Sequence, residues 1–307
     1  MTRAPVGFVG IGNMGLGMAL RLRDGGHAVR VHDLDEAREQ AAQAQGASVH
    51  ADAAAVAQGC ELLIVAVVDA AQTEAVLFGE RGAVHGLAPG ATVMLCPTIA
   101  PQTVERCTAR LAERGIHTID APMSGGPQRA RDGTMSLMVA CADAPFERWH
   151  GVLQQLSSRL FRIGPRPGDG ARTKLVNNLL AAINLAGAAE ALALAQHVGL
   201  DPVATLAVIE QSSGQSWIGS DRLRRALAAD PSVLAHMSLL TKDSALAMAM
   251  AAEAGVQPAL GQAAAARFAA ACADGLAGAD DGALWAWVRD RFRRSAGDRP
   301  AAPESAP

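Results

Sequence analysis

The chain contains PVGFVGIGNMGLGMA at residues 5–19, which is an apolar strand, a Gly-x-Gly-x-x-Gly turn and the start of a helix. The first glycine of such a turn permits a tight bend, the second lets the backbone approach a pyrophosphate, and the third lets the helix pack closely on the strand. Phosphate groups then bind the free N–H groups at the helix N-terminus. The stretch predicts a dinucleotide-binding loop with cofactor contacts from Gly10, Ile11, Gly12, Asn13, Met14 and Gly15.

A second apolar run, residues 28–32, ends in Asp33. A carboxylate at the end of the second strand of such a unit hydrogen-bonds a ribose 2′-OH. Because strand, glycine turn, helix, second strand and acid all follow in order, the sequence favours a nucleotide site over a ligand-free glycine turn. The same charge repels a 2′-phosphate, and Asp35 adds to the negative field. Because Arg30 and Arg38 are near in sequence, NADP stays as the weaker alternative. We expect NAD as the cofactor.

The composition narrows the class of protein. A chain of 307 residues is long enough for two domains. Half of the residues are hydrophobic and 19% are charged, as in ordinary globular proteins. The net charge of −3 gives no electrostatic reason to expect nucleic acid or an anionic membrane as a partner. The chain has no tyrosine, which excludes a mechanism with a tyrosine proton donor.

The cysteines and the apolar segments indicate a cytoplasmic protein. The five cysteines are odd in number and have no metal-type spacing, so we expect neither disulfides nor a metal. No targeting signal is evident before the first strand. The apolar stretch at residues 179–195 contains Asn184 and Glu190, so we expect a buried helix and not a membrane span.

The first half of the chain alternates strand-like and helical segments. Short apolar runs that end at polar residues or at Gly and Pro predict strands at 6–9, 28–32, 62–68, 92–96, 117–120 and 136–140. Helical segments such as 35–45 and 101–114 lie between them. This order predicts the α/β class, with a doubly wound sheet of parallel strands over residues 1–165.

From residue 171 the pattern is helical. Predicted helices cover 171–198, 202–211, 221–229, 238–254, 260–273 and 283–293, and we find no strand signal among them. The sequence thus predicts a Rossmann domain at 1–165, which binds the dinucleotide, and an all-helical domain at 166–294, entered through a long helix. The Pro- and Ala-containing tail at 295–307 is predicted to be disordered.

Four further segments carry polar groups suited to chemistry. Asp120 ends a predicted strand, and the turn after it holds Ser124, Gly125 and Gly126. Such a turn can be purely structural, but its free amides beside a hydroxyl also suit a carboxylate. After the glycine loop at 164–170, Lys174 stands four residues before an asparagine, Asn178, on one helix face.

A lysine on an otherwise apolar helix either extends its amine to water or serves a site. Partial desolvation makes it a usable acid or base. A hydrogen-bonding pair between domains is the structural alternative for Lys174 and Asn178. Lys242 and Asp243 stand together inside a later apolar helix, where a surface ion pair is the simple alternative. Thr98 follows a predicted strand, at the sheet edge where ligands bind.

These motifs, in this order, resemble the β-hydroxyacid dehydrogenase family, which includes 3-hydroxyisobutyrate dehydrogenase and tartronate semialdehyde reductase. The resemblance extends from residue 5 to about residue 293. It rests on Gly-x-Gly-x-Met-Gly at 10–15, Thr-Ile-x-Pro at 98–101, Asp-Ala-Pro-x-Ser-Gly-Gly at 120–126, Gly-x-Gly-x-x-x-Lys-x-x-Asn-Asn at 168–178 and Lys-Asp at 242–243.

The resemblance implies a role for each motif. Lys174 would be the general acid/base on the substrate hydroxyl or carbonyl. Ser124, Gly125 and Gly126 would bind the substrate carboxylate, and Asn178 would orient the substrate. Other residues that would line the cofactor site are Val67, Thr98 and Lys242. Relatives imply a homodimer or homotetramer, and the substrate would be a small hydroxy acid.

Within the family, the chain is most similar to the L-threonate dehydrogenase-like branch. The shared segments are 68–72, 76–82, 161–164 and 213–217, whereas Asn177-Asn178 and the residues after Trp217 depart from the branch. The implied substrate is a 3-hydroxy acid or a sugar acid such as L-threonate, with 3-hydroxyisobutyrate or tartronate semialdehyde as alternatives. An imine reductase is disfavoured by Lys174 and the lack of tyrosine. A catalytically silent dinucleotide-binding sensor is disfavoured by the retained Ser124, Lys174 and Asn178.

Overall fold

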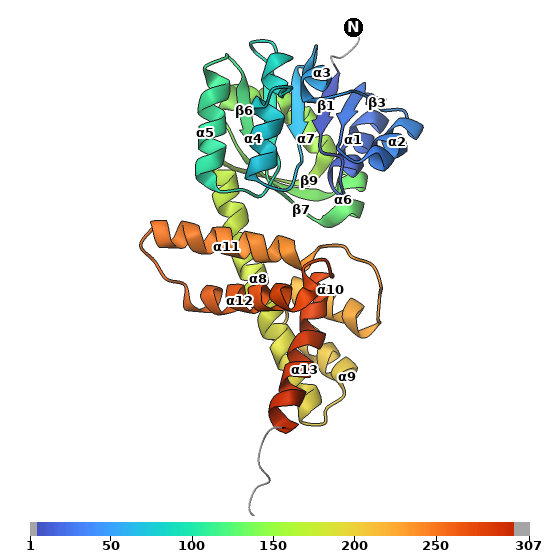
Figure 1. Ribbon diagram of the computed structural model, residues 1–307, viewed down its shortest axis with the longest axis vertical. Helices are drawn as coiled ribbons and strands as arrows, with labels where there is room; N and C mark the ends of the chain where they lie inside the picture. The colour runs from blue at the N-terminus through green and yellow to red at the C-terminus, as the bar shows by residue number, and fades with distance from the viewer. Residues whose placement is uncertain (1–4, 298–307) are drawn as a thin grey trace, which may run out of the picture. The chain divides into compact units, whose positions relative to one another are not determined.

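The computed structural model describes residues 5–297, which fold into two compact units divided after Val176 (Figure 1). The first unit contains a nine-stranded sheet in the order β3-β2-β1-β4-β5-β6-β8-β7, with β9 beside β8. The strands are β1 (Val6–Val9), β2 (Val29–His32), β3 (Ser48–Val49), β4 (Leu62–Val65), β5 (Thr92–Leu95), β6 (His117–Asp120), β7 (Met123–Ser124), β8 (Met135–Ala140) and β9 (Ser157–Gly164).

The strand order 3-2-1-4-5-6, with every neighbouring pair parallel, is that of dinucleotide-binding sheets. The predicted α/β class and doubly wound sheet are therefore confirmed. The sheet is not parallel throughout, however, because β8 runs antiparallel to β6 and to β7, and β9 is parallel to β8.

Helices cover both faces of this sheet. They are α1 (Gly15–Asp24), α2 (Glu36–Ala44), α3 (Ala53–Ala57), α4 (Ala70–Phe78), the 3-10 turn η1 (Ala83–His85), α5 (Pro101–Ala112), α6 (Gly126–Asp132) and α7 (Asp143–Leu156). One core packs α1, α6 and α7 on the sheet, and the other packs α3, α4 and α5. On β4, Ile64 enters the first core while Leu63 and Val65 enter the second. Burial on both faces explains why this strand is apolar throughout.

The structure corrects several strand boundaries and adds strands that the sequence pattern hides. The predicted strands at 62–68 and 92–96 end earlier, at Val65 and Leu95, because the following residues enter loops at the carboxyl edge. The longest addition is β9, which contains Arg159 and Arg162 and exposes alternate residues. An edge strand whose sequence is interrupted by arginines lacks the apolar run of a buried strand.

The second unit is helical in all its regular elements that the structure describes. It comprises α8 (Asp169–His197) from Asn177 onward, α9 (Pro202–Glu210), α10 (Trp217–Leu227), α11 (Met237–Glu253), α12 (Ala259–Ala271), the π-helical turn η2 (Cys272–Leu276), the 3-10 turn η3 (Asp281–Ala283) and α13 (Leu284–Gly297). Its core includes Leu185, Leu192 and Phe268, all fully buried. Side-chain caps define two helix starts: Asp201 caps α9 and Ser216 caps α10.

Helix α8 is long and apolar enough to cross a membrane by length and composition alone, and it is the one such helix in residues 5–297. It also supplies Leu185, Ala189 and Leu192 to the helical core, as a core helix of a globular protein does. At the C-terminal end, the sequence predicted a disordered tail from Ser295, and this boundary is too early. Helix α13 continues to Gly297, because the first proline lies only at Pro300, and the rest of the predicted tail lies outside the described residues.

Candidate active site

The turn between β1 and α1 can be formed only by glycines at two positions. Gly10 has φ +87°, and a Cβ there would lie 2.8 Å from the carbonyl oxygen of Ala66 and 2.9 Å from Cγ1 of Val67. A Cβ on Gly15 would collide with the carbonyl oxygen of Gly10. The turn thus brings Val67 beside the loop, and its role in lining the cofactor site stays a prediction.

The same turn leaves backbone donors available for a phosphate. Helix α1 begins after Met14 without a side-chain cap and has no acidic residue in its first turn. A helix start of this kind is a ready site for an anion. A Cβ on Gly12 would meet only the Arg38 guanidinium within 4 Å, at 3.1 Å, so the backbone is accessible there. A cavity of about 350 Å³ lies along this loop and includes Arg38 and Arg131 in its wall. The residues present fit a dinucleotide.

Asp33 lies directly after β2 and joins that strand to the glycine loop. Its Oδ2 accepts a hydrogen bond from the backbone N–H of Ile11 at 2.7 Å, and its Oδ1 accepts one from the N–H of Asp35 at 3.0 Å. The Arg38 guanidinium lies 3.9 Å from Asp33 and 3.3 Å from Asp35. A carboxylate has lone pairs for further donors, so these bonds leave Asp33 able to accept a ribose hydroxyl.

Asp120 ends β6 and is 1% exposed. Its Oδ2 accepts hydrogen bonds from the N–H groups of Gly168 at 2.7 Å and Ala171 at 3.1 Å, where α8 begins. Burial raises the pKa of Asp120 to about 6, although backbone donors, including Gly170, act in the opposite direction. The start of the helix that carries Lys174 is therefore attached to the end of a central strand.

Ser124, Gly125 and Gly126 lie where β7 turns into α6. Gly125 has φ +141° and Gly126 has φ +81°, so both positions favour glycine. A Cβ on Gly125 would lie 2.9 Å from Cδ of Arg129. The three residues are partly exposed. The turn leaves a hydroxyl and glycine backbone accessible, as the carboxylate-binding hypothesis requires.

Lys174 lies on α8, one turn before Asn178, and is only 7% exposed. In the helical unit, Nδ2 of Asn178 donates to Oδ2 of Asp243 at 2.6 Å, and Nζ of Lys242 lies 2.8 Å from Oδ1 of Asp243. Asp243 therefore links Asn178 to Lys242. The side-chain oxygen of Asn178 accepts a hydrogen bond from Asn177 at 3.0 Å.

The scarcity of lysine in the chain is a further sequence signal for the site, which the motif analysis did not use. Only two of the 27 lysine and arginine residues are lysines, and they are Lys174 and Lys242. The remaining positive charge on the protein is carried by arginine. The motif positions thus hold an amine, which can exchange a proton near neutral pH when it is desolvated, in a chain that otherwise uses guanidinium groups.

Two other contacts near the site could not be read from the pattern. The Arg38 guanidinium beside Gly12 depends on the folded position of α2, and the bonds from α8 to Asp120 join residues far apart in sequence. For the contact between α8 and Asp120, the sequence offered two signals: an aspartate at a strand end and two glycines just before Lys174. Thr98 lies just after β5 in the nucleotide unit, and Lys242 lies on α11 in the helical unit.

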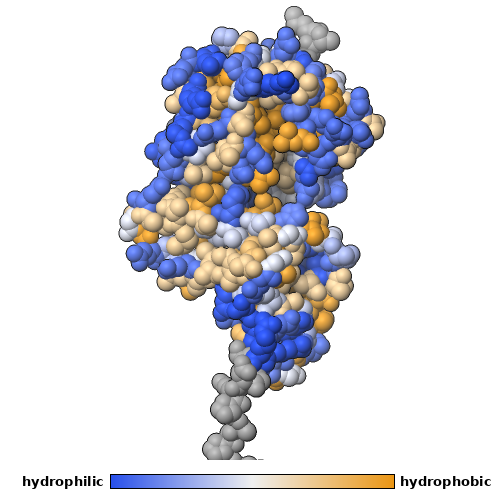
Figure 2. All heavy atoms as spheres, in the orientation of Figure 1, coloured by the Kyte–Doolittle hydropathy of each residue, from blue (hydrophilic) through white to orange (hydrophobic). Residues whose placement is uncertain are grey.

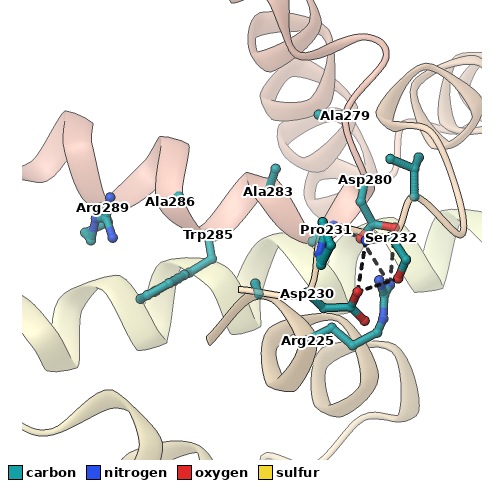
Figure 3. Close-up of a pocket in the computed structure, with 13 residues that line it drawn as sticks. Arg225, Asp230, Pro231, Ser232, Ala279, Asp280, Ala283, Trp285, Ala286 and Arg289 are labelled. Atoms are coloured by element: carbon teal, nitrogen blue, oxygen red, sulfur yellow. Dashed lines mark hydrogen bonds and ion pairs between the residues drawn. The ribbon is translucent and has the colours of Figure 1, made fainter. Parts of the chain in front are cut away.

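The helical unit has a cavity of about 430 Å³ at the junction of α10, the loop before α11 and α13 (Figure 3). Arg225 and Asp280 cluster at one end, where Asp280 also accepts a hydrogen bond from the N–H of Leu234. These bonds hold the loop that leads into α11. Within residues 5–297, no group of three or more His, Cys, Asp and Glu residues is placed to hold a metal ion.

A Rossmann sheet with this glycine turn and acidic strand end defines a dinucleotide-binding protein. Residues 5–164 match the family model described as the NAD-binding domain of 6-phosphogluconate dehydrogenase. Residues 168–288 match the model described as NAD-binding of NADP-dependent 3-hydroxyisobutyrate dehydrogenase.

Among characterised relatives, L-threonate dehydrogenase of Cupriavidus necator is 35% identical over 280 residues, 91% of this chain and 94% of that protein. The 3-hydroxyisobutyrate dehydrogenase of Pseudomonas aeruginosa is 36% identical over 69% of this chain and 71% of its own. A solved 3-hydroxyisobutyrate dehydrogenase of Salmonella typhimurium superposes with a TM-score of 0.87 at 31% identity, covering 93% of this chain and 100% of that one. The chain belongs to the 3-hydroxyisobutyrate dehydrogenase-like family. It is an NAD-binding oxidoreductase that acts on CH–OH groups of small hydroxy acids.

Proposed function

We propose that the protein oxidises L-threonate with NAD, using Lys174 as the general acid/base. The substrate assignment rests on the L-threonate dehydrogenases at 32–36% identity, one of which matches along 94% of its length. The runner-up substrate is 3-hydroxyisobutyrate, supported by the P. aeruginosa relative of that name.

The proton chemistry is assigned to Lys174 because it is a buried amine on α8. In its neutral form the amine accepts the proton of the substrate hydroxyl as the C–H bond breaks, and it later returns that proton to solvent. NAD, when bound, supplies the hydride acceptor. Asn178 is a turn away on the same helix and orients the substrate, while Ser124, Gly125 and Gly126 bind its carboxylate. Asp243 holds Asn178 and Lys242 in place through its two oxygens.

The preference for NAD over NADP is assigned to Asp33. Its negative charge meets a 2′-phosphate with repulsion, whereas its oxygens accept from ribose hydroxyls. Arg38 is near enough to attract a phosphate, but Asp33 and Asp35 both face its guanidinium. We assign the other cofactor contacts to Gly10, Ile11, Gly12, Asn13, Met14, Gly15, Val67, Thr98 and Lys242. We assign residues 1–165 as the dinucleotide-binding domain and 166–294 as the helical domain for substrate binding and dimerisation, with Ser124, Gly125 and Gly126 as substrate-binding residues of the first and Lys242 as a cofactor-binding residue of the second.

A homodimer or homotetramer is supported by apolar side chains exposed on the helical unit. Leu194, Val198, Leu200 and Val203 are each more than half exposed, and Leu260 is 71% exposed. Figure 2 shows further apolar surface where alanine-rich α11 and α12 lie. Exposed apolar patches of this kind mark interaction surfaces.

The five free cysteines support a location in the reducing cytoplasm. Cell fractionation tests this assignment.

The substrate assignment is tested by assaying NAD reduction with L-threonate, D-threonate, 3-hydroxyisobutyrate, glycerate and L-serine. We expect kcat/KM for L-threonate to exceed the others by about tenfold or more, a difference of ~1.4 kcal/mol in transition-state binding. A higher value for 3-hydroxyisobutyrate or L-serine would reject the sugar-acid assignment while leaving the family intact.

For Lys174→Ala we expect turnover to fall by roughly 10²–10⁴, because a positioned acid/base group is lost. Lys174→Arg should be similarly impaired, since a guanidinium does not exchange its proton near neutral pH. NADH affinity, measured by fluorescence titration, should stay within about twofold. Arg172→Ala is the matched control, because it removes another cation from the same helix. Near-normal turnover in Lys174→Ala would contradict the mechanism.

For Asp33→Ser we expect the ratio of kcat/KM for NADP to that for NAD to rise by about tenfold or more, because a repelling charge is removed beside Arg38. The gain should disappear in Asp33→Ser combined with Arg38→Ala. Thermal denaturation monitors the cost of losing the bond to Ile11. An unchanged cofactor ratio in the folded single variant would show that Asp33 does not set the preference.

The oligomer is tested by sedimentation velocity. We expect the wild-type protein to sediment as a dimer or tetramer. Replacing two exposed apolar residues, Leu194→Glu near the end of α8 and Val198→Glu in the turn after it, should shift the protein toward the 31.6 kDa monomer. The reason is that burying a carboxylate at an interface is unfavourable. A wild-type monomer at micromolar concentration would refute the assignment.

A further inference from the structure

The first turn of α8 is attached to the sheet by a side chain that no motif role explains. The carboxylate of Asp120, at the end of β6, accepts from the N–H groups of Gly168 and Ala171, and Gly170 adds a backbone hydrogen bond. The first N–H groups of a helix have no partner within the helix. A residue 48 or more positions away in sequence thus caps α8, and the cap comes from the sheet itself.

The two glycines before Lys174 have a physical reason in this contact. Gly168 has φ +99°, which favours glycine. A Cβ on Gly170 would lie 2.9 Å from the Asp120 carboxylate and 2.7 Å from the carbonyl oxygen of Met138. The chain therefore passes directly against the end of β6 and against β8 at this point. The start of the helix therefore contacts the sheet one turn before Lys174.

This arrangement restricts where the amine of Lys174 can be. An α-helix rises about 1.5 Å per residue, so Lys174 is roughly 4.5 Å along the axis from the capped N–H of Ala171. Its own side chain is almost fully buried. A shift of the first turn would move the lysine by a comparable amount, and a displacement of about 1 Å at a reacting group can lower a rate about 100-fold.

Burial by itself favours a neutral side chain at this position over the carboxylate of Asp120. Burial raises the pKa of Asp120 to about 6, and neighbouring Asp169 acts in the same direction. A buried carboxylate is costly unless it is well hydrogen-bonded, and a neutral residue of similar shape avoids that cost. The structure keeps a full carboxylate here, with its oxygen directed at the start of the helix that carries the lysine.

We propose that Asp120 is a positioning residue for Lys174: by capping α8 from the end of β6, it fixes the place and orientation of the lysine amine. This inference rests on the proposed role of Lys174 as acid/base. Asp120 acts through the helix and needs no contact with substrate or cofactor.

Because the chain has only two lysines, the proposal has a direct spectroscopic readout. Protein labelled with ¹³C at lysine Cε gives one signal for Lys174 and one for Lys242, and variants at Lys174 assign them. In Asp120→Asn, which keeps one oxygen acceptor, and in Asp120→Ala, which keeps none, we expect the Lys174 signal to move and the Lys242 signal to stay. We expect kcat to fall about tenfold in the first and about 100-fold in the second, with NADH affinity within twofold.

The matched control is Asp169→Asn, which removes a carboxylate from the same helix turn whose partners are Arg166 and Arg172. It should leave kcat and the Lys174 signal nearly unchanged. The proposal is overturned if folded Asp120→Asn keeps both its kcat and its Lys174 signal. It is also overturned if kcat and NADH affinity fall together while the Lys174 signal stays in place, because Asp120 would then act on cofactor binding and not on the position of the lysine.

Should Asp120→Ala fail to fold, Asp120→Asn decides the matter. Failure of the underlying function is separately visible: Lys174→Ala would then retain turnover whatever the Asp120 variants do.

Discussion

The contact of backbone with backbone between β1 and α1 is the constraint on which the nucleotide unit depends. At Gly15 any side chain would collide with the carbonyl oxygen of Gly10. The helix can therefore approach the strand this closely only if residue 15 is glycine. That approach packs α1 into the core under the sheet and leaves the uncapped start of α1 directed toward the loop. Asp33 then joins the neighbouring strand to the same loop through the N–H of Ile11. Cofactor recognition thus follows from how closely one helix can pack.

In both units, carboxylates connect elements that are distant in sequence. Asp120 holds the start of α8, Asp243 joins Asn178 to Lys242, and Asp280 fixes the loop before α11. In the helical unit, Asp281 is 2% exposed, and burial raises its pKa to about 6, although it pairs with Arg222. A carboxylate can accept several hydrogen bonds at once, so one side chain can order a junction where regular backbone pairing ends. The residues of the site therefore depend on groups that need not touch a ligand.

Much of the fold was predictable from the sequence because its elements have strong local signals. Apolar runs gave β1 and β6 at their observed bounds, and the helical pattern after residue 171 gave the elements of the second unit within a few residues. Strand β9 was missed because its arginines interrupt the apolar pattern at an open edge. At the site, motif spacing brought out Lys174, Asn178 and Asp33. The links made by Asp120 and Asp243 depend on the folded chain, and no local pattern contains them.

The scarcity of lysine and the absence of tyrosine have a consequence for the alkaline titration of this protein. Arginine keeps its charge far above neutral pH, and there is no phenol to ionise. Burial raises the pKa of Cys60 and of Cys107 to about 11, and it also raises those of Cys96 and Cys141. Between about pH 8 and 10 the guanidinium groups and these four buried thiols therefore add little change of charge. The electrostatic background is thus almost constant over the range in which amines deprotonate, so an alkaline change in rate can be assigned to very few atoms.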